Sequence, residues 1–94
     1  RMATQTLYDE LKSVPYLYPY PSDGNFVLCK ILYGFTAAQL TSALFEKHNM
    51  LINDSSGKRG LDNRFVRLAS RTKEENLELA EAMRSLTELA RASQ

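Results

Sequence analysis

The fold of this chain follows from the stretch Arg64-Phe-Val-Arg-Leu-Ala-Ser-Arg-Thr-Lys-Glu-Glu-Asn76, where a short β-type run leads into a helical pattern. Successive side chains of a strand point to opposite faces, so Val66 and Leu68 share one face, and Arg67 lies on the other with Phe65. An arginine among apolar and aromatic neighbours is costly to bury alone, and it is usually retained because an anion binds it. An arginine on an edge strand that faces water fits the periodicity equally well, so both interpretations stay open.

The same stretch also predicts where a long C-terminal helix begins. Thr72, followed by Glu75 three residues later, forms a capping box, and Glu74 lies favourably near the positive end of the helix dipole. The helix then continues with one apolar face, which comprises Leu79, Met83, Leu86 and Ala90. This apolar face predicts that the helix packs against the sheet.

Two further helices are predicted upstream of this stretch. Leu7, Leu11 and Val14 recur at helical spacing, which indicates a first amphipathic helix that the following proline ends. Thr36 is a suitable N-cap for a second helix over residues 37–48. The apolar stripe of that second helix comprises Leu40, Leu44 and Phe45.

The strands are shorter and more varied. The nearly continuous apolar run Asn25–Ile31 predicts a strand buried on both faces, and residues 50–52 and 65–69 predict two more. The segment Pro15–Pro21 cannot form a central strand because its prolines lack N–H donors; it predicts an extended connector whose tyrosines pack on the neighbouring helix, or a polyproline-type ligand. The order α-β-α-β-β-α predicts a single α/β (α+β) sandwich domain over residues 1–94, with a small mixed sheet of about three to four strands packed with helices.

Composition argues against nucleic-acid-binding, membrane-spanning and disulfide-bonded classes of protein. Twelve basic and eleven acidic residues give a net charge of +1, which is too balanced to indicate nucleic acid or an anionic membrane surface as a partner. No apolar run in the sequence approaches the roughly 18 residues that span a bilayer. The single cysteine, Cys29, excludes an internal disulfide and fits a reducing compartment, so we expect a cytoplasmic protein.

Few residue patterns suggest chemistry by themselves. No cluster of cysteine and histidine has metal-ligand spacing, so no metal site is predicted. His48 falls at a helix end, where a solvated histidine is common, and Cys29 alternates with apolar residues as a small core residue would. The loop Ser55–Gly60 lacks the spacing of a phosphate-binding P-loop. Arg67 therefore stands out as the candidate site residue.

Four motifs occur in an order that a known family shares. They are Leu7-Tyr-Asp-Glu-Leu-Lys12, Tyr20-Pro-Ser-Asp-Gly-Asn-Phe26, Ser56-Gly-Lys-Arg-Gly-Leu61, and the pair Val66-Arg67 followed by Thr72, Glu74, Glu75 and Asn76. In this order and spacing they resemble the C-terminal small domain of fold-type I pyridoxal-phosphate enzymes. The resemblance is to the subgroup of histidinol-phosphate aminotransferase and threonine-phosphate decarboxylase, and it covers nearly the whole chain.

The resemblance implies that substrate recognition and cofactor chemistry lie in different domains of a longer parent protein. The family's Schiff-base lysine, the aspartate that meets the pyridine nitrogen and the phosphate-binding residues lie upstream in a large domain. Pyridoxal 5'-phosphate would be bound there, and the separate chain would bind no cofactor and be inactive. The family's arginine equivalent to Arg67 binds the carboxylate or phosphate of an amino-acid or phosphorylated amine substrate. The full-length parent would be a pyridoxal-phosphate-dependent transaminase that forms a homodimer.

Departures from the family pattern refine this expectation. Many histidinol-phosphate enzymes have the sequence VRD where this chain has Ile52-Asn53-Asp54, which argues against histidinol phosphate as the substrate. Arg71 resembles the VRT ending of the phosphothreonine decarboxylase branch, and Arg59 can reach an anion from its loop, so both are secondary candidates for substrate binding. Two alternatives stay open. The parent is an amino-acid phosphate decarboxylase, or the domain is a non-enzymatic interaction module that uses the tyrosine-proline segment or the face that would otherwise meet the large domain.

A small domain separated from its parent should leave apolar surface uncovered where the large domain docked. We expect that surface at Tyr16, Tyr18 and Tyr20 and on the first helix, which would connect to the large domain. Such a surface would favour self-association of the separate chain.

Overall fold

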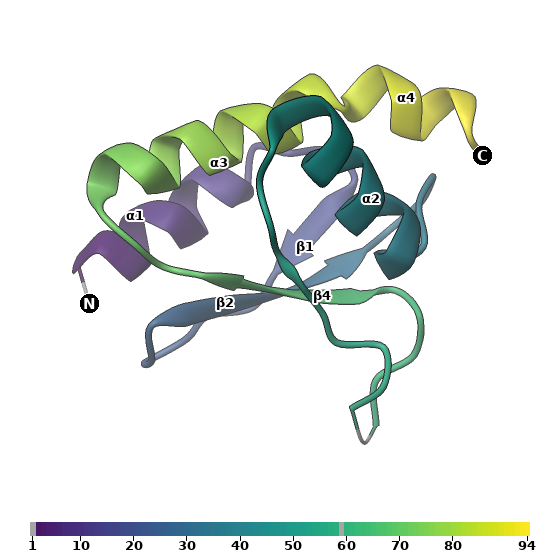
Figure 1. The fold of residues 1–94 in the computed structure, drawn as a ribbon. Coiled ribbons are helices and arrows are strands. Elements are labelled where there is room, and N and C mark those ends of the chain that lie inside the picture. Colours follow the sequence, from purple (N-terminus) through teal and green to yellow (C-terminus); the bar gives the residue numbers. More distant parts are fainter. Residues whose placement is uncertain (1, 59) are drawn as a thin grey trace.

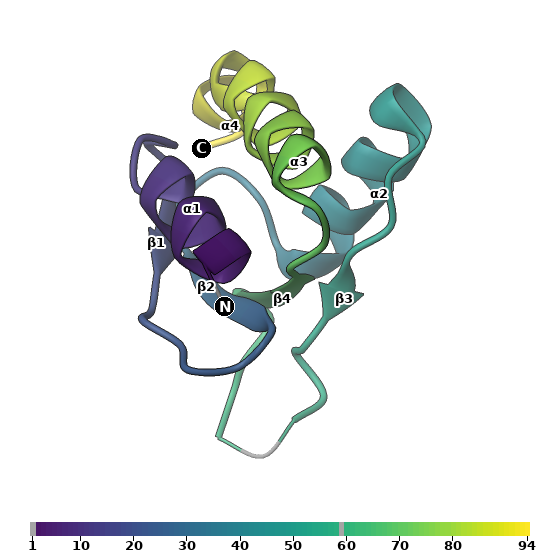
Figure 2. The same ribbon diagram turned by 90° about the vertical axis from the view of Figure 1, so that its left-hand side faces the viewer.

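The architecture is one antiparallel sheet with helices on one of its sides. A computed structural model describes residues 2–58 and 60–94. The helices are α1 (Met2–Leu11), α2 (Ala37–His48), α3 (Lys73–Ser85) and α4 (Thr87–Ala92), and the strands are β1 (Leu17–Pro19), β2 (Phe26–Ile31), β3 (Asn53–Asp54) and β4 (Phe65–Ala69). Figures 1 and 2 show the helices on the same side of the sheet, and they leave the other face open. The predicted α/β sandwich is confirmed.

Strand β4 is an interior strand of the sheet, whose order is β1-β2-β4-β3. Leu28 of β2 lies opposite Arg67 on one side, and Asn53 of β3 lies opposite it on the other. Every paired strand in the described residues is antiparallel, so the expected mixture of strand directions is wrong. The connection through α2 does make β2 and β3 point the same way, but β4 is inserted between them. Since β4 has a neighbour on each side, Arg67 is not an edge-strand residue.

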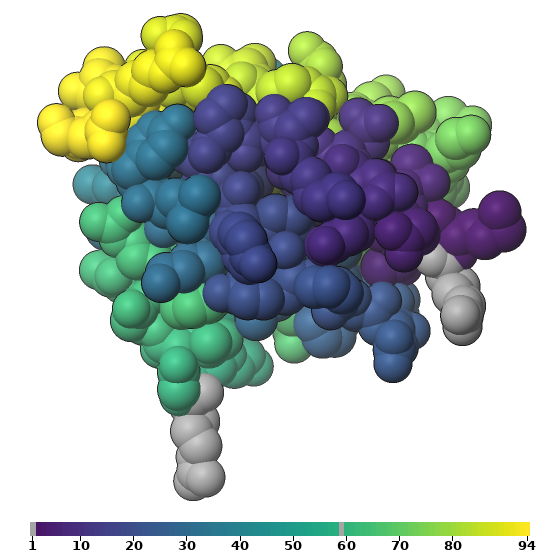
Figure 3. Space-filling model, turned by 180° about the vertical axis from the view of Figure 1, so that it is seen from behind, coloured from purple at the N-terminus to yellow at the C-terminus, as the bar shows by residue number. Residues whose placement is uncertain are grey.

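The tyrosine-proline segment forms an edge strand, β1, which pairs with β2. An edge position tolerates a proline because no N–H needs to be donated there. Tyr18 is exposed and Tyr20 is half-buried, and Figure 3 shows α1 (purple) with the β1 and β2 segments (blue) as one continuous surface. Tyr16 is fully buried, and its hydroxyl donates to the Met83 carbonyl oxygen at 2.7 Å. The expectation of uncovered surface is therefore wrong for Tyr16.

Strand β2 is buried on one face only, which corrects the expected burial on both faces. Val27, Cys29 and Ile31 are buried, whereas Phe26 and Lys30 are exposed. The apolar run gave the wrong expectation because the helices cover only one side of the sheet. Cys29 is the small core residue that the sequence predicts. Burial raises the pKa of its thiol to about 12, so the thiol stays protonated and unreactive at neutral pH.

Two capping boxes fix the starts of the long helices where the sequence predicts them. Thr36 begins α2 and Thr72 begins α3, and each threonine hydroxyl accepts a hydrogen bond from the backbone N–H three residues later. Other boundaries differ from expectation. The C-terminal helix is interrupted at Leu86, so it consists of α3 and α4. The short strand predicted at residues 50–52 lies instead at Asn53–Asp54, where the chain comes alongside β4.

Candidate functional site

Arg67 lies on the open face of the sheet. On β4, Val66 and Leu68 are fully buried, and Arg67 is half-buried on the opposite face, as the alternation predicts. The guanidinium carbon of Arg67 lies 4.9 Å from the centre of the Phe26 ring, which is a cation–π contact. In the register of the sheet Phe26 is opposite Ala69, so it is the diagonal neighbour of Arg67. The sheet therefore fixes the backbone of this arginine, and an aromatic ring supports its planar head.

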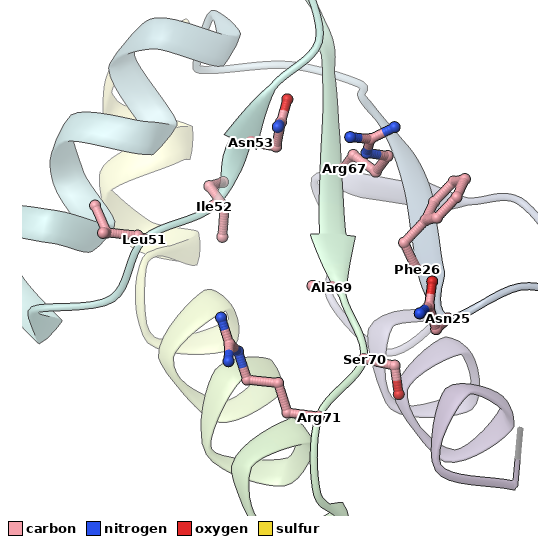
Figure 4. Close-up of a pocket in the computed structure, with 9 residues that line it drawn as sticks. All are labelled: Asn25, Phe26, Leu51, Ile52, Asn53, Arg67, Ala69, Ser70 and Arg71. Atoms are coloured by element: carbon pink, nitrogen blue, oxygen red, sulfur yellow. The ribbon is translucent and has the colours of Figure 1, made fainter.

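A cavity of about 440 Å³ opens beside Arg67, and we call it the arginine cavity. It is lined by Asn25, Phe26, Leu51, Ile52, Asn53, Arg67, Ala69, Ser70 and Arg71. Figure 4 shows that these residues come from the start of β2, from β3 and the segment before it, and from β4 and the residues that follow it, with Arg71 extending toward the Leu51–Asn53 side. Among the described residues, two guanidinium groups and no carboxylate line the cavity, so its charge favours an anionic ligand.

The two arginines of the cavity are available to a ligand. In the part of the chain that the structure describes, the ion pairs involve Lys12, Arg84 and Arg91, and none involves Arg67 or Arg71. Arg67 is half-buried and Arg71 is exposed, so the guanidinium donors of both side chains can reach a ligand in the cavity. The arrangement can therefore bind a carboxylate or a phosphate with two parallel hydrogen bonds.

Arg71 reaches the cavity because β4 ends two residues before it and the chain turns there into α3. Its backbone N–H donates to the Asn76 Oδ1 at 2.9 Å, and the next residue, Thr72, is the N-cap of α3. The structure thus brings Arg71, a secondary candidate from the sequence, to the same cavity as Arg67. The other secondary candidate, Arg59, lies outside the described residues.

The sequence did not identify the polar residues around the two arginines. Asn25, Asn53 and Ser70 line the cavity as well, and no local sequence pattern marks them as anion-binding residues. Asn76 is 1% exposed and lies four residues before Ala80 on the buried side of α3. A polar residue on the inward stripe of a helix is the sequence signal that could have drawn attention to Asn76.

Lysines do not take part in this site. The five lysines of the chain are exposed, and none of them lines the arginine cavity. They are Lys12, Lys30, Lys47, Lys58 and Lys73. Pyridoxal phosphate needs a lysine for its covalent attachment, so the residues of this cavity do not fit attachment of that cofactor.

Neither a metal cluster nor a membrane-spanning helix occurs in the described residues. They contain no group of three or more His, Cys, Asp and Glu side chains that could hold a metal ion. His48 lies at the end of α2, with its Nε2 3.1 Å from the Ser85 Oγ. No described helix has the length and apolar character needed to cross a lipid bilayer.

Comparison with known proteins gives two kinds of relative. The chain is 34% identical over 73 residues to the L-serine phosphate decarboxylase of Campylobacter jejuni and 38% identical over 78 residues to a putative threonine-phosphate decarboxylase of Caldanaerobacter subterraneus, matches that cover 78% and 83% of the chain. It is 30% identical over 84 residues, 88% of its length, to the histidinol-phosphate aminotransferase of Methanopyrus kandleri. These matches span only 19–21% of each relative. No protein-family model matches the chain.

Solved structures show the same fold. The L-threonine-O-3-phosphate decarboxylase from Porphyromonas gingivalis superposes with a TM-score of 0.87 and 31% identity, over 93% of this chain and 26% of that one. The histidinol-phosphate aminotransferase from Clostridium acetobutylicum superposes with a TM-score of 0.85 at 22% identity, over 93% of this chain and 26% of that one. The chain therefore belongs to the fold-type I pyridoxal-phosphate enzymes, in the subgroup of threonine-phosphate decarboxylase and histidinol-phosphate aminotransferase, and has the fold of their C-terminal small domain.

Proposed function

We propose that the chain is the C-terminal small domain of a pyridoxal-phosphate-dependent aminotransferase, and that Arg67 binds the carboxylate or phosphate of its substrate. The observation that carries this proposal is the position of Arg67 in a cavity whose described lining has a second arginine and no carboxylate. The substrate is an amino acid or a phosphorylated amine, because those compounds present such an anion together with the amine on which the cofactor acts.

The geometry of Arg67 suits recognition of a planar anion. Its guanidinium presents two parallel N–H donors to one carboxylate or phosphate edge. The Phe26 ring contacts the guanidinium group, and the pairing of β4 with β2 and β3 fixes the point from which the side chain extends. A ligand that enters the arginine cavity therefore meets donors that are already oriented, which reduces the entropy cost of binding.

The rest of the catalytic apparatus belongs, in this proposal, to an upstream large domain of the same chain. Pyridoxal phosphate supplies an electron sink for the bond that breaks at the substrate carbon. The residues of the small domain bind and orient the substrate anion, and the open face of the sheet, with Phe26 and Arg67, faces the large domain so that water is excluded. A homodimer and a cytoplasmic location are part of the same proposal.

A second candidate is an amino-acid phosphate decarboxylase that uses the same cofactor. Two observations favour it. Arg71 lines the same cavity as Arg67, so two guanidinium groups are present for a substrate that carries both a carboxylate and a phosphate. The serine-phosphate and threonine-phosphate decarboxylases are 34% and 38% identical to the chain, whereas the histidinol-phosphate aminotransferase of Methanopyrus is 30% identical.

The reaction products decide between these functions. The full-length protein should be incubated with O-phospho-L-serine, O-phospho-L-threonine or L-histidinol phosphate, with and without a 2-oxo acid as amino acceptor. Transamination consumes the 2-oxo acid and yields a new amino acid, whereas decarboxylation releases CO₂ without an acceptor. Turnover of any of the three supports an enzyme that recognises an anionic substrate. A full-length protein that binds no cofactor and turns over none of them would instead be an interaction module.

The separate 94-residue chain is expected to bind no pyridoxal phosphate and to transaminate no amine, because none of its exposed lysines lies at the cavity. Incubation with the cofactor, reduction with borohydride and peptide mass spectrometry measure this directly. We expect only scattered, substoichiometric labelling of surface lysines. Stoichiometric labelling of one lysine would contradict the prediction.

A further inference from the structure

A buried asparagine joins the arginine cavity to helix α1. Asn76 lies in the first turns of α3 and is 1% exposed. Its side-chain amide donates to the Ala3 carbonyl oxygen and to the Ser70 Oγ, both at 3.0 Å, and its Oδ1 accepts from the Arg71 N–H at 2.9 Å. We call these three hydrogen bonds the Asn76 bridge. They use both donors of the amide and one lone pair of its oxygen, so the side chain can adopt only one orientation.

Two of the three partners of the Asn76 bridge line the arginine cavity. Ser70 and Arg71 are the residues between the end of β4 and Thr72, the N-cap of α3. Hydrogen bonds of β4 hold this turn on one side, and the capping box holds it on the other. Asn76 holds it from the interior. The Asn76 amide thus contacts the backbone at Arg71, the point from which the Arg71 side chain extends into the cavity.

The third partner lies on another helix. Ala3 is 73 residues from Asn76 in the sequence, and it belongs to the first turn of α1. Figures 1 and 2 show α1 alongside α3. Because one rigid amide contacts both elements, the start of α1 and the rim of the arginine cavity are held in a fixed relation. Loss of the amide would leave the Arg71 N–H without its partner at a half-buried site, so the turn would have to rearrange.

We propose that Asn76 is a positioning residue for substrate binding, and that it acts through Arg71 rather than by touching the substrate. This inference rests on the proposed function, since it requires that an anionic ligand occupies the arginine cavity. It goes beyond that function because it assigns the placement of one anion-binding arginine to a buried side chain on α3.

A double-mutant cycle in the full-length protein tests the inference. The variants are Asn76→Ala, Arg71→Ala and the two combined, and the measurement is KM for whichever of O-phospho-L-serine, O-phospho-L-threonine and L-histidinol phosphate the wild-type protein turns over fastest. We expect Asn76→Ala to raise KM by about 10- to 100-fold, as small misplacements of a binding group do. In the Arg71→Ala background, the same change should alter KM by no more than about twofold, because the group that Asn76 positions is already absent.

Met83→Ala is the matched control, because it removes a fully buried side chain from α3 at a distance from the cavity. Met83→Ala should lower the melting temperature and leave KM unchanged.

The inference is overturned if Asn76→Ala raises KM by the same factor in both backgrounds, if Asn76→Ala lowers the melting temperature without changing KM, or if Arg71→Ala has no effect on KM. If Asn76→Ala does not fold, Asn76→Leu takes its place in the same cycle, because leucine fills a similar volume and removes all three hydrogen bonds of the bridge. If Arg67→Ala lowers kcat/KM but the effects of Asn76→Ala and Arg71→Ala on KM are additive, this inference alone is overturned. If Arg67→Ala leaves kcat/KM unchanged, the proposed function is overturned.

Discussion

Replacement of Arg67 by alanine is expected to lower kcat/KM of the full-length enzyme. The loss in transition-state stabilisation should be about 3–5 kcal/mol, because hydrogen bonds to charged groups contribute about 1.5–3 kcal/mol each and two are lost together. Arg67→Lys should recover only part of the loss, because an ammonium is a point charge that cannot form two parallel bonds to one anion edge. Folding should change little, since in the described residues Arg67 has no ion pair to lose. Steady-state kinetics, together with thermal unfolding of each variant, measure both effects.

The control for Arg67 is Arg91→Ala. The Arg91 side chain is 56% exposed and forms one surface ion pair, with Glu88 on the same helix. Exposed pairs of this kind contribute little, so kcat/KM and stability should both stay close to wild type. If Arg67→Ala leaves kcat/KM within a few-fold of wild type and unfolds the domain, then Arg67 has a structural role and the proposed anion site is wrong.

Replacement of Gly34 by alanine is expected to destabilise the domain by about 3–5 kcal/mol, the sum of backbone strain and overpacking. Gly34 has φ +88°, a left-handed conformation that residues with a side chain rarely adopt, and an added Cβ would collide with the backbone of Ala90. Gly34 therefore allows α4 to approach the connection between β2 and α2 closely. Urea denaturation of the chain, followed by circular dichroism, measures the loss in the free energy of unfolding.

Gly57→Ala is the matched control for Gly34. An added Cβ at Gly57 would meet no atom within 4 Å, and this glycine does not have a positive φ. The free energy of unfolding should therefore change by less than about 0.5 kcal/mol. Equal stabilities of the two variants would show that α4 does not pack against the β2–α2 connection as described.

Local sequence patterns predicted those parts of the fold that local chemistry decides. The capping boxes at Thr36 and Thr72 satisfy backbone donors within four residues, so the helix starts could be located from the sequence. The alternation of Val66 and Leu68 against Arg67 likewise follows from strand geometry alone, and the structure confirms it.

Features that depend on distant segments could not be predicted in the same way. The position of β4 between β2 and β3 depends on contacts between segments that are distant in the sequence. The expected mixture of strand directions was therefore wrong. Phe45 lies within the predicted apolar stripe of α2 but is 51% exposed, because no described segment covers it. Tyr16 is buried where its hydroxyl can donate to the Met83 carbonyl oxygen, 67 residues away.

The candidate site likewise contains residues that local sequence predicts and residues that only tertiary packing brings together. A strand arginine among apolar residues pointed to Arg67, and the family resemblance added Arg71. The cavity itself is formed where the end of β4 meets residues from β2 and from the segment before β3, which no single stretch of sequence reveals. Asn76 belonged to a recognised motif, yet its contacts with Ala3, Ser70 and Arg71 depend on the packing of α1 beside α3.

The most direct test of the central claim is a crystal structure of the full-length protein with an analogue of O-phosphoserine that lacks the amino group. This analogue keeps the carboxylate and the phosphate but cannot react with the cofactor through an amine. The account predicts that one of its anionic groups occupies the arginine cavity, with two N–H donors of Arg67 at about 2.7–2.9 Å from its oxygens. An analogue bound in the active site with both anions away from Arg67, and Arg67 still directed into water, would contradict the account.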